Sequence, residues 1–164
     1  TYKDGFFELP YLANNPKTMV KSFAKMPFNK HYINKNCFIS NNPFIYGELY
    51  YRELEDELWV FYGEVNYKTN VSYNLIYDKS LPIDYYTLSY NKVTNKVTEV
   101  GFMIDDVSLN SSSWSLFKPK GNLKNYHFKN NTVANLFLCF TQNWYDKNIK
   151  EKVTTNSVFN DFIL

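Results

Sequence analysis

The feature that most constrains the fold of this chain is a succession of short apolar segments between residues 44 and 140. β-Branched and aromatic residues dominate these segments, as they do in β-strands. The stretches between them, such as residues 79–82 and 95–96, carry the Lys, Ser, Pro and Asn that are typical of turns. About eight short strands at this spacing predict a mainly β, antiparallel sandwich or barrel. We expect strands at residues 44–53, 58–66, 71–77, 85–91, 97–104, 114–117, 126–128 and 133–140.

A helical pattern precedes the predicted strands. Asn15 can cap a helix, Pro16 suits its first turn, and the apolar residues that follow share one face. We therefore expect a short helix within residues 14–25. Residues 26–43 are punctuated by Asn and Pro, which predicts mainly loop with one brief strand.

A second helical pattern follows the predicted strands. Thr141 can cap a helix, and an apolar stripe comes after it. A further amphipathic segment then ends at the apolar residue Leu164. Because an exposed apolar end is uncommon, we expect the natural protein to continue beyond residue 164. The stripe consists of Trp144, Tyr145, Ile149 and Val153.

Length and charge narrow the classes of function. The chain has 164 residues, which suits one domain with a sizeable core. It contains no apolar run as long as a membrane span. Its net charge is +2 without a basic stripe, which disfavours nucleic-acid binding by this segment. No secretory signal is visible, and Cys37 and Cys139 lie among apolar residues, as buried reduced thiols do. We expect a cytoplasmic protein with no membrane partner.

Aromatic residues make up 20% of the chain, so their origin bears on function. One interpretation is a surface that stacks on carbohydrates or bases. The favoured interpretation is a codon bias that raises Asn, Lys, Ile, Tyr and Phe together. It agrees with the presence of one arginine, Arg52, among 18 Lys and Arg residues.

The stretch SSSWSLFKPKGNLKNYHF, residues 111–128, is the most informative local pattern. Its apolar run ends in Pro119-Lys120-Gly121, and His127 follows. Together with the final strand and the block at residues 50–91, this stretch resembles the cupin-type sensor domain of AraC/XylS-family transcription regulators, in particular their Bacteroidetes-type members. The resemblance covers residues 44–164 and rests on apolar patterns and one turn rather than on a catalytic signature.

The resemblance implies three regions and a set of partners. Residues 1–43 would be a helix and an extended segment that pack on a cupin-like β-barrel at residues 44–141. Residues 142–164 would form a helical dimerisation and linker segment, cut before a DNA-binding domain. Such domains bind small organic effectors without a metal and pair as homodimers, and the full-length protein would contact DNA through the absent domain.

A metal site is not expected in the predicted barrel. A metal-binding cupin places a histidine three residues after the glycine of Pro-x-Gly, where this chain has Lys124, which cannot ligate in its charged form. Such a site also needs clustered His and carboxylate ligands, whereas the chain has two histidines, His31 and His127. No catalytic constellation is visible either, so we expect neither a cofactor nor an enzyme.

The predicted ligand site is a set of aromatic side chains on neighbouring strands. Each of them, taken singly, is also a normal core residue, and the pattern does not say which face lies inside. Tyr and Trp offer flat apolar area with a polar tip, which suits sugars or aromatic metabolites. The expected ligand-binding residues are Trp59, Phe61, Tyr73, Tyr86 and His127.

Two classes of function therefore remain. The first is the effector-sensing and dimerisation domain of a transcription regulator, which binds a small organic ligand without a metal. The second is a free-standing carbohydrate-binding β-sandwich module. A metal-free cupin enzyme is a more distant third. A downstream reading frame with helix-turn-helix patterning would favour the first class, and a stop codon just after Leu164 would favour the second.

Overall fold

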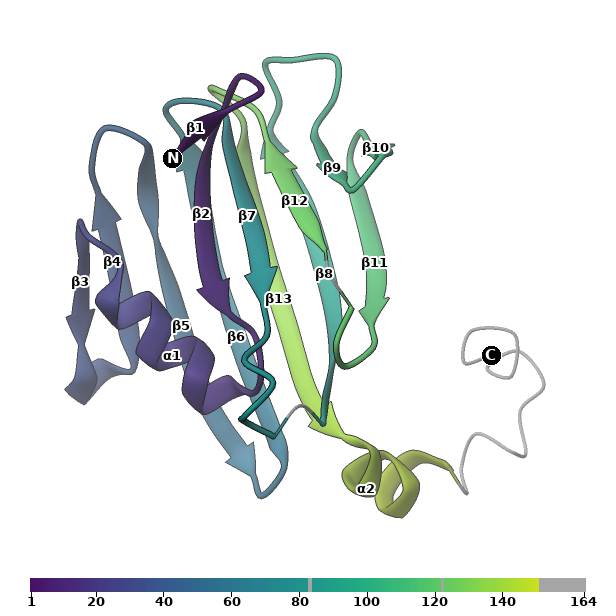
Figure 1. The fold of residues 1–164 in the computed structure, drawn as a ribbon. Helices are drawn as coiled ribbons and strands as arrows, with labels where there is room; N and C mark the ends of the chain where they lie inside the picture. Colours follow the sequence, from purple (N-terminus) through teal and green to yellow (C-terminus); the bar gives the residue numbers. More distant parts are fainter. Residues whose placement is uncertain (83, 122, 151–164) are drawn as a thin grey trace.

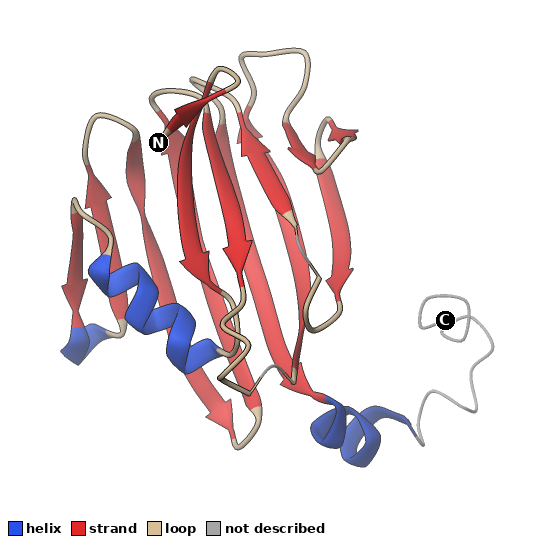
Figure 2. Ribbon diagram, viewed as in Figure 1, coloured by secondary structure: helices blue, strands red, loops and turns tan. Residues whose placement is uncertain are grey.

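The computed structural model describes residues 1–82, 84–121 and 123–150 and shows two β-sheets stacked face to face (Figures 1 and 2). The six-stranded sheet contains, in spatial order, β1 (Tyr2–Lys3), β2 (Phe6–Leu12), β7 (Val71–Ile76), β12 (Lys124–His127), β9 (Phe102–Ile104) and β10 (Val107–Leu109). The seven-stranded sheet contains β11 (Ser112–Phe117), β8 (Tyr85–Asn95), β13 (Thr132–Thr141), β6 (Leu58–Tyr67), β5 (Ile45–Glu55), β4 (Cys37–Asn41) and β3 (Asn29–Tyr32).

The expected mainly β, antiparallel-rich class is confirmed, with a correction to its closure. Among the described residues, every strand pairing is antiparallel except that of β2 with β7. None of these pairings joins the two sheets, so the structure is an open sandwich and not a closed barrel.

The eight predicted strands are present, but the region before residue 44 holds more strand than the sequence indicated. Residues 1–43 contain β2, which pairs with β7, and the hairpin β3–β4, which pairs with β5. Pro10 lies within β2, and a proline usually argues against a paired strand. It is tolerated here because β1 pairs only with Phe6 and Phe7, which leaves β2 an edge strand at Pro10.

The predicted N-terminal helix is confirmed as α1 (Pro16–Lys25). Asn15 caps it: the Asn15 side chain accepts from the backbone N–H of Thr18, and the Thr18 hydroxyl accepts from the backbone N–H of Asn15. Met19 is buried in the helix face that contacts the core. Figure 1 shows α1 beside β2, where it covers the part of the seven-stranded sheet that extends past the edge of the smaller sheet.

Inward-facing residues of both sheets form two apolar clusters. The first cluster joins α1 to the middle of the seven-stranded sheet and consists of Met19, Phe38, Tyr51, Trp59, Phe61 and Cys139. The second lies farther along the sandwich and consists of Ile45, Tyr67, Val71 and Val133. Cys37 and Cys139 are buried free thiols, as expected.

Two glycines let β5 and β6 lie unusually close together. A Cβ on Gly63 would meet the backbone oxygen of Glu48, and a Cβ on Gly47 would meet that of Glu64. Both positions face the interior, in series with Leu49 and Val65. The absence of side chains at these two positions therefore leaves space between the sheets.

Buried asparagines hold the long loops at the ends of the sandwich. The Asn131 side chain is 0% exposed; it accepts from the backbone N–H groups of Val97 and Thr98 and donates to three oxygens, those of Thr98 Oγ1, Val100 and Gly101. This network replaces the first part of the strand predicted at residues 97–104, and β9 begins only at Phe102.

The described C-terminal part contains α2 (Gln142–Tyr145) and a short π-helical turn, η2 (Asp146–Lys150). Thr141 caps α2 as predicted, since its side chain accepts from the backbone N–H of Trp144 at 3.1 Å. Residues 151–164, with the predicted stripe residue Val153 and the second amphipathic segment, lie outside the described residues.

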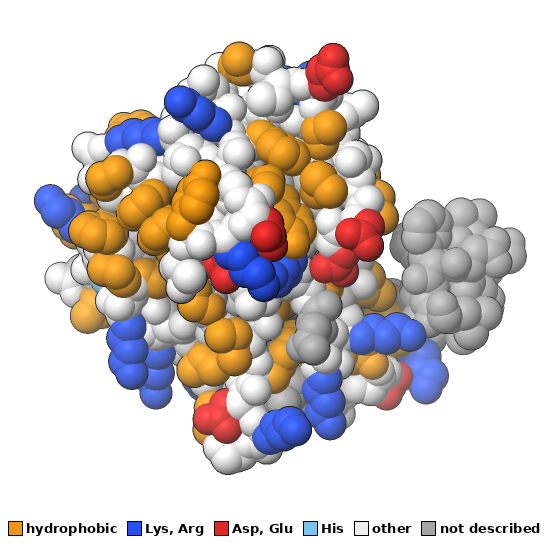
Figure 3. Space-filling model, turned by 45° about the horizontal axis from the view of Figure 1, so that its top comes forward, with side chains coloured by type: hydrophobic (Ala, Val, Ile, Leu, Met, Phe, Trp, Pro, Cys, Tyr) orange, Lys and Arg blue, Asp and Glu red, His pale blue; other side chains and the backbone are white. Residues whose placement is uncertain are grey.

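The described surface mixes apolar and charged side chains. On the face in Figure 3, hydrophobic side chains lie between Lys, Arg, Asp and Glu side chains of both signs. None of the described helices is long and apolar enough to cross a bilayer.

Candidate ligand-binding cavity

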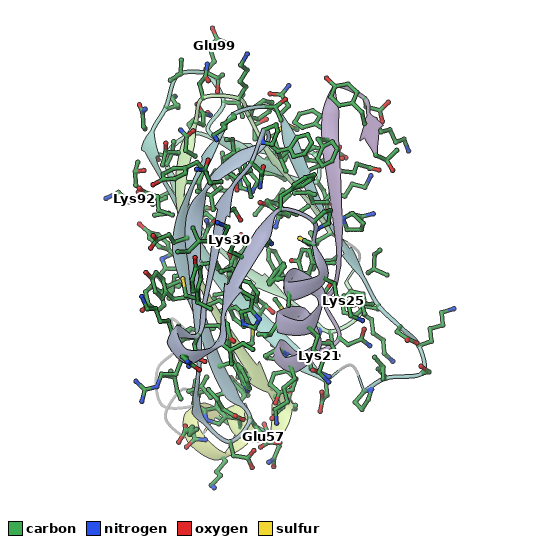
Figure 4. The ribbon with its side chains drawn as sticks, turned by 90° about the vertical axis from the view of Figure 1, so that its left-hand side faces the viewer. Lys21, Lys25, Lys30, Glu57, Lys92 and Glu99 are labelled. Atoms are coloured by element: carbon green, nitrogen blue, oxygen red, sulfur yellow. The ribbon has the colours of Figure 1, made fainter. Side chains whose placement is uncertain are left out.

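A cavity of about 140 Å³ lies between the two sheets at the edge next to α1. Its lining comes from α1 and the loop that joins it to β3, from the loop between β4 and β5, and from strands of both sheets, namely β2, β3, β4, β5, β6, β7, β8, β12 and β13. Figure 4 shows this edge, with Lys21 and Lys25 on α1 and Lys30 on β3. These three lysines are exposed and none of them lines the cavity.

The wall near the opening is aromatic. Phe7 and Phe44 stack with ring centroids 3.7 Å apart and an interplanar angle of 9°. Phe28 lies against Phe44, is 59% exposed, and has a left-handed backbone with φ of 77°. A bulky residue in this conformation is rare, so the Met26–Asn29 turn holds Phe28 at the opening against a local backbone cost.

The opposite end of the cavity is polar, and we call it the polar floor. Each of its residues occupies an inward-facing position, because side chains alternate between the two faces of a strand. These strands therefore bring polar groups to positions that an interior normally fills with apolar ones. The floor consists of Tyr67, Tyr73, Asn91, Asn125, His127 and Asn135.

His127 is a buried polar residue of the floor, with 4% exposure. Its ring lies parallel to the Tyr67 ring, with centroids 4.3 Å apart at 3°, and Tyr73 meets it edge-on at 5.7 Å. Within the described part of the chain, His127 Nδ1 has no hydrogen-bond partner. An unpaired buried nitrogen is costly, so this atom needs a partner that the protein itself does not provide.

Burial also fixes the charge of His127. Desolvation lowers the pKa of its imidazole to about 3, so the ring is neutral at physiological pH. A neutral imidazole has one nitrogen that donates and one that accepts a hydrogen bond. The same desolvation raises the pKa of Tyr73 to about 12, which keeps its hydroxyl protonated.

Three asparagines complete the floor. Asn91 donates one amide N–H to Ser89 Oγ at 2.8 Å, and Asn135 donates one to the carbonyl oxygen of Val133 at 3.1 Å. The Oδ1 atom of Asn125 is buried without a partner among the described residues. The Asn125 oxygen is therefore an acceptor that remains for a ligand.

The cavity lining carries almost no charge. Among the described residues that line it, Glu48 is the one that carries a formal charge at neutral pH. Its carboxylate accepts a hydrogen bond from the Tyr50 hydroxyl at 2.6 Å. A second, smaller cavity of about 40 Å³ adjoins the first and shares Tyr11, Phe23, Asn125 and Phe137 with it. Asn125 thus borders both spaces.

The sequence-predicted ligand residues fall into three locations. Tyr73 and His127 line the cavity. Trp59 and Phe61 belong to the first apolar cluster instead. Tyr86 is on the outer face of the seven-stranded sheet, where it stacks on Phe140 at 5.8 Å. The structure therefore brings two of the five together at one cavity.

The floor asparagines were missed, although the sequence contains a signal for them. In β13, Asn135 lies on the same face of the strand as the apolar residues Val133, Phe137 and Cys139. In β8, Asn91 and Ser89 likewise lie on the same face of the strand. A polar residue at a core-facing position is an anomaly that points to a functional site.

The predicted dimerisation residues that are described contact their own sheet. Trp144 packs on Phe140 at 5.7 Å, and its indole N–H donates to Glu55 Oε1 at 2.6 Å. Tyr145 also stacks near Phe140, at 6.4 Å, and Ile149 in η2 is partly buried.

Lys124, at the position where a metal-binding cupin carries a histidine, faces away from the cavity. Lys124 forms an ion pair with Glu8 at 3.0 Å, and this contact lowers the pKa of Glu8 and raises that of Lys124. No group of three His, Cys, Asp or Glu side chains that could hold a metal occurs among the described residues.

A second aromatic feature crosses the outer face of the seven-stranded sheet, and we call it the outer aromatic row. Its members are direct cross-strand partners on β5, β6, β13, β8 and β11. Tyr62 and Trp114 are 49% and 60% exposed. The row consists of Tyr50, Tyr62, Leu136, Tyr90 and Trp114.

Comparisons with known proteins give little further information. No family model matches the chain, and no curated protein matches it. A solved structure of the Clostridium difficile EutQ protein aligns with a TM-score of 0.33 and 15% identity, over 60% of this chain and 71% of that chain. A similarity this weak carries no argument, so the relation to AraC/XylS-type sensor domains stays a prediction.

Proposed function

We propose that this domain binds a small organic molecule in the cavity between its sheets, without a metal, and that binding rather than catalysis is its function. One observation carries the proposal. His127 Nδ1 and Asn125 Oδ1 are buried at the floor of a cavity that opens to the surface, and neither has a hydrogen-bond partner among the described residues.

The free energy of these two groups supports a ligand. Each unpaired buried polar group costs about 1–3 kcal/mol relative to a paired one. Apolar residues of similar shape would avoid this cost. Two such groups at one end of one cavity are therefore consistent with a partner that arrives from solution.

The cellular role that we propose is the effector-sensing domain of a transcription regulator. Its support is the sequence resemblance of residues 50–91 and 111–128 to AraC/XylS-type sensor domains. In this role the protein is a homodimer that pairs through Trp144, Tyr145, Ile149 and Val153, and a separate domain contacts DNA. A reading frame that continues past residue 164 into a basic helix-turn-helix region supports the role, and a stop codon there contradicts it.

A thermal-shift screen tests binding in the cavity. Compounds from the neutral aromatic, sugar and carboxylate classes are added at increasing concentration, and a ligand should raise the Tm by mass action. Val65→Phe fills the cavity and should abolish the shift. The matched control is Val60→Phe on the opposite face of the same strand, which should keep it. Absence of any ligand from a broad screen contradicts the proposal.

The second candidate is a carbohydrate-binding module, and the outer aromatic row favours it. Exposed Tyr and Trp rings in a line offer flat apolar area with polar tips, which suits sugar rings. Five adjacent strands span about 19 Å at a strand spacing of roughly 4.8 Å. Retention on a polysaccharide resin that is lost in Trp114→Ala and Tyr62→Ala, and kept in Val65→Phe, would support this function over the cavity.

A further inference from the structure

The size of the cavity limits its ligand to about one ring. An engineered protein cavity of about 150 Å³ is known to bind benzene. The cavity in this chain has about 140 Å³, close to that value. A two-ring compound or a nucleotide would therefore extend beyond the cavity.

The electrostatics of the lining exclude a charged ligand. Burying an ion without a counter-ion is strongly unfavourable. None of the described lining residues is Lys, Arg or Asp, and Glu48 directs its carboxylate to Tyr50. His127 is neutral and supplies no positive charge. Carboxylates, phosphates and ammonium compounds would all lack a partner inside the cavity.

The distribution of polar groups excludes a sugar. A monosaccharide carries hydroxyls all around its ring, and each needs a hydrogen bond once it leaves water. Phenylalanines make up much of this lining, namely Phe7, Phe23, Phe38, Phe44 and Phe137. Outside the floor, the polar lining residues Asn29, Ser40 and Asn42 already hydrogen-bond within the protein. A ligand that matches this lining is apolar over most of its surface and polar at one end.

The floor specifies the polar end as well. Asn125 Oδ1 is a buried acceptor without a partner among the described residues, and the amides of Asn91 and Asn135 each already use one N–H within the protein. The unpaired Asn125 oxygen requires a ligand that donates an O–H or N–H. His127 accepts or donates according to its tautomer, so it can serve the same hydroxyl.

We propose that the cavity binds an uncharged monocyclic aromatic molecule with one hydroxyl donor, that is, a phenol, whose ring lies among the aromatic walls and whose hydroxyl contacts His127 and Asn125. This inference rests on the proposed function and names the ligand class of the same site. It selects the aromatic metabolite over the sugar and locates binding inside the sandwich rather than on its outer face.

The experiment is a calorimetric titration of the 164-residue chain with four probes. Phenol has the ring and the donor, and it is uncharged at neutral pH because its hydroxyl ionises near pH 10, as tyrosine does. Benzene has the ring without the donor, benzoate has the ring with a charge, and glucose has donors without an aromatic ring. Phenol should bind to one site, benzene about tenfold more weakly, and benzoate and glucose at least about a hundredfold more weakly.

Two floor variants and one control separate the hydroxyl contact from general packing. Asn125→Leu and His127→Phe should each lower the affinity for phenol about tenfold and leave that for benzene unchanged or higher. Tyr86→Ala, on the outer face, should leave both affinities unchanged. Each floor variant alone tests the contact with the phenol hydroxyl, so the test remains if one of the two variants does not fold.

The outcomes distinguish the ligand class from the function. Equal affinities for phenol and benzene, or equal losses of both in the floor variants, overturn the assigned hydroxyl contact. Binding of glucose or benzoate in preference to phenol overturns the class but leaves the cavity a ligand site, provided that Val65→Phe blocks it. If none of the four probes binds, the phenol class is overturned. If no compound of the broad screen binds either, the proposed function is overturned as well.

Discussion

Two sets of buried polar side chains in this sandwich differ in how the protein satisfies them. Asn131, at the end of the sandwich, is fully buried and takes part in five hydrogen bonds with residues 97–101. Asn125 and His127, at the cavity floor, each bury a polar atom that has no partner among the described residues. The same chain thus completes one polar network and leaves the other open.

This contrast distinguishes buried polar groups that stabilise the fold from those that are available to a ligand. A fully hydrogen-bonded network such as that of Asn131 holds a loop in place, and its hydrogen bonds offset the free-energy cost of removing these groups from water. An unsatisfied group costs stability, and proteins retain such groups mainly where a ligand or a reaction uses them. Trp59 Nε1 and Ser113 Oγ are also buried without partners, but neither residue lines the cavity. What distinguishes the floor is the combination of unpaired atoms with open volume.

Removal of the satisfied group should have the largest effect. Asn131→Ala leaves the Val97 and Thr98 N–H groups and two carbonyl oxygens without their partner. We expect a loss of about 3 kcal/mol or more in the free energy of unfolding, measured by urea denaturation. Asn110→Ala, at an exposed position, is the control and should change it by less than about 0.5 kcal/mol. Similar losses in both variants would contradict the claim that the Asn131 network stabilises the fold.

The neutral state of His127 should make stability depend on pH. Its pKa falls from 6.5 in the unfolded chain to about 3 in the folded one, so the unfolded state binds the extra proton between these values. Stability is therefore complete above pH 6.5 and falls as the pH is lowered, by roughly 1.4 kcal/mol per pH unit from this residue.

His127→Phe should remove this contribution. Denaturation curves of the variant and of the natural chain between about pH 6.5 and pH 4 should diverge, because the carboxylates contribute equally to both and cancel. Parallel pH dependences would mean that His127 protonates freely in the folded protein.

Replacement of an unsatisfied group should cost nothing in the ligand-free protein. Asn125→Leu has a similar shape and removes an unpaired acceptor, so we expect unchanged stability or a gain of about 1 kcal/mol by urea denaturation. The gain should disappear at high phenol concentration, because phenol stabilises the natural chain more than a variant that binds it about tenfold more weakly. A loss of stability comparable with that of Asn131→Ala would mean that Asn125 belongs to the structural set.

The smallest effect is expected on the outer face. Tyr86 was a candidate ligand residue from the sequence, but it stacks on Phe140 away from the cavity. Tyr86→Ala should change the affinity for a cavity ligand by less than about twofold, as measured by calorimetry. A larger loss would transfer the site to the outer face.

Local signals in the sequence predicted most of the fold. The cap Asn15 with Pro16 located α1, and runs rich in β-branched and aromatic residues located the long strands β5, β6, β8 and β13. The pairing of β2 with β7 was not predictable in this way, because residues 64 positions apart, Phe7 and Val71, meet through long-range pairing that no local pattern encodes.

The site was less predictable than the fold for the same physical reason. Aromatic residues at strand positions fill a core or line a cavity equally well, so Trp59 and Phe61 could not be separated from Tyr73 before the packing was known. Polar residues at inward parity, such as Asn135, carried more information than the aromatic count did. Whether such a residue is satisfied, as Asn131 is, depends on loops that only the folded structure brings together.

Nitrogen NMR of the two imidazole rings tests the central claim most directly. His31 Nε2 is hydrogen-bonded to the Tyr51 hydroxyl at 2.7 Å and serves as the internal reference, whereas His127 Nδ1, at the cavity, has no partner in the described part of the chain. We expect the His127 ring to stay neutral between about pH 5 and pH 8, consistent with its lowered pKa. Its nitrogen resonances should move on addition of saturating phenol, or of the strongest compound from the screen, while those of His31 stay in place. Titration of His127 near pH 6.5, or nitrogen resonances that do not respond to a bound ligand, would contradict the account.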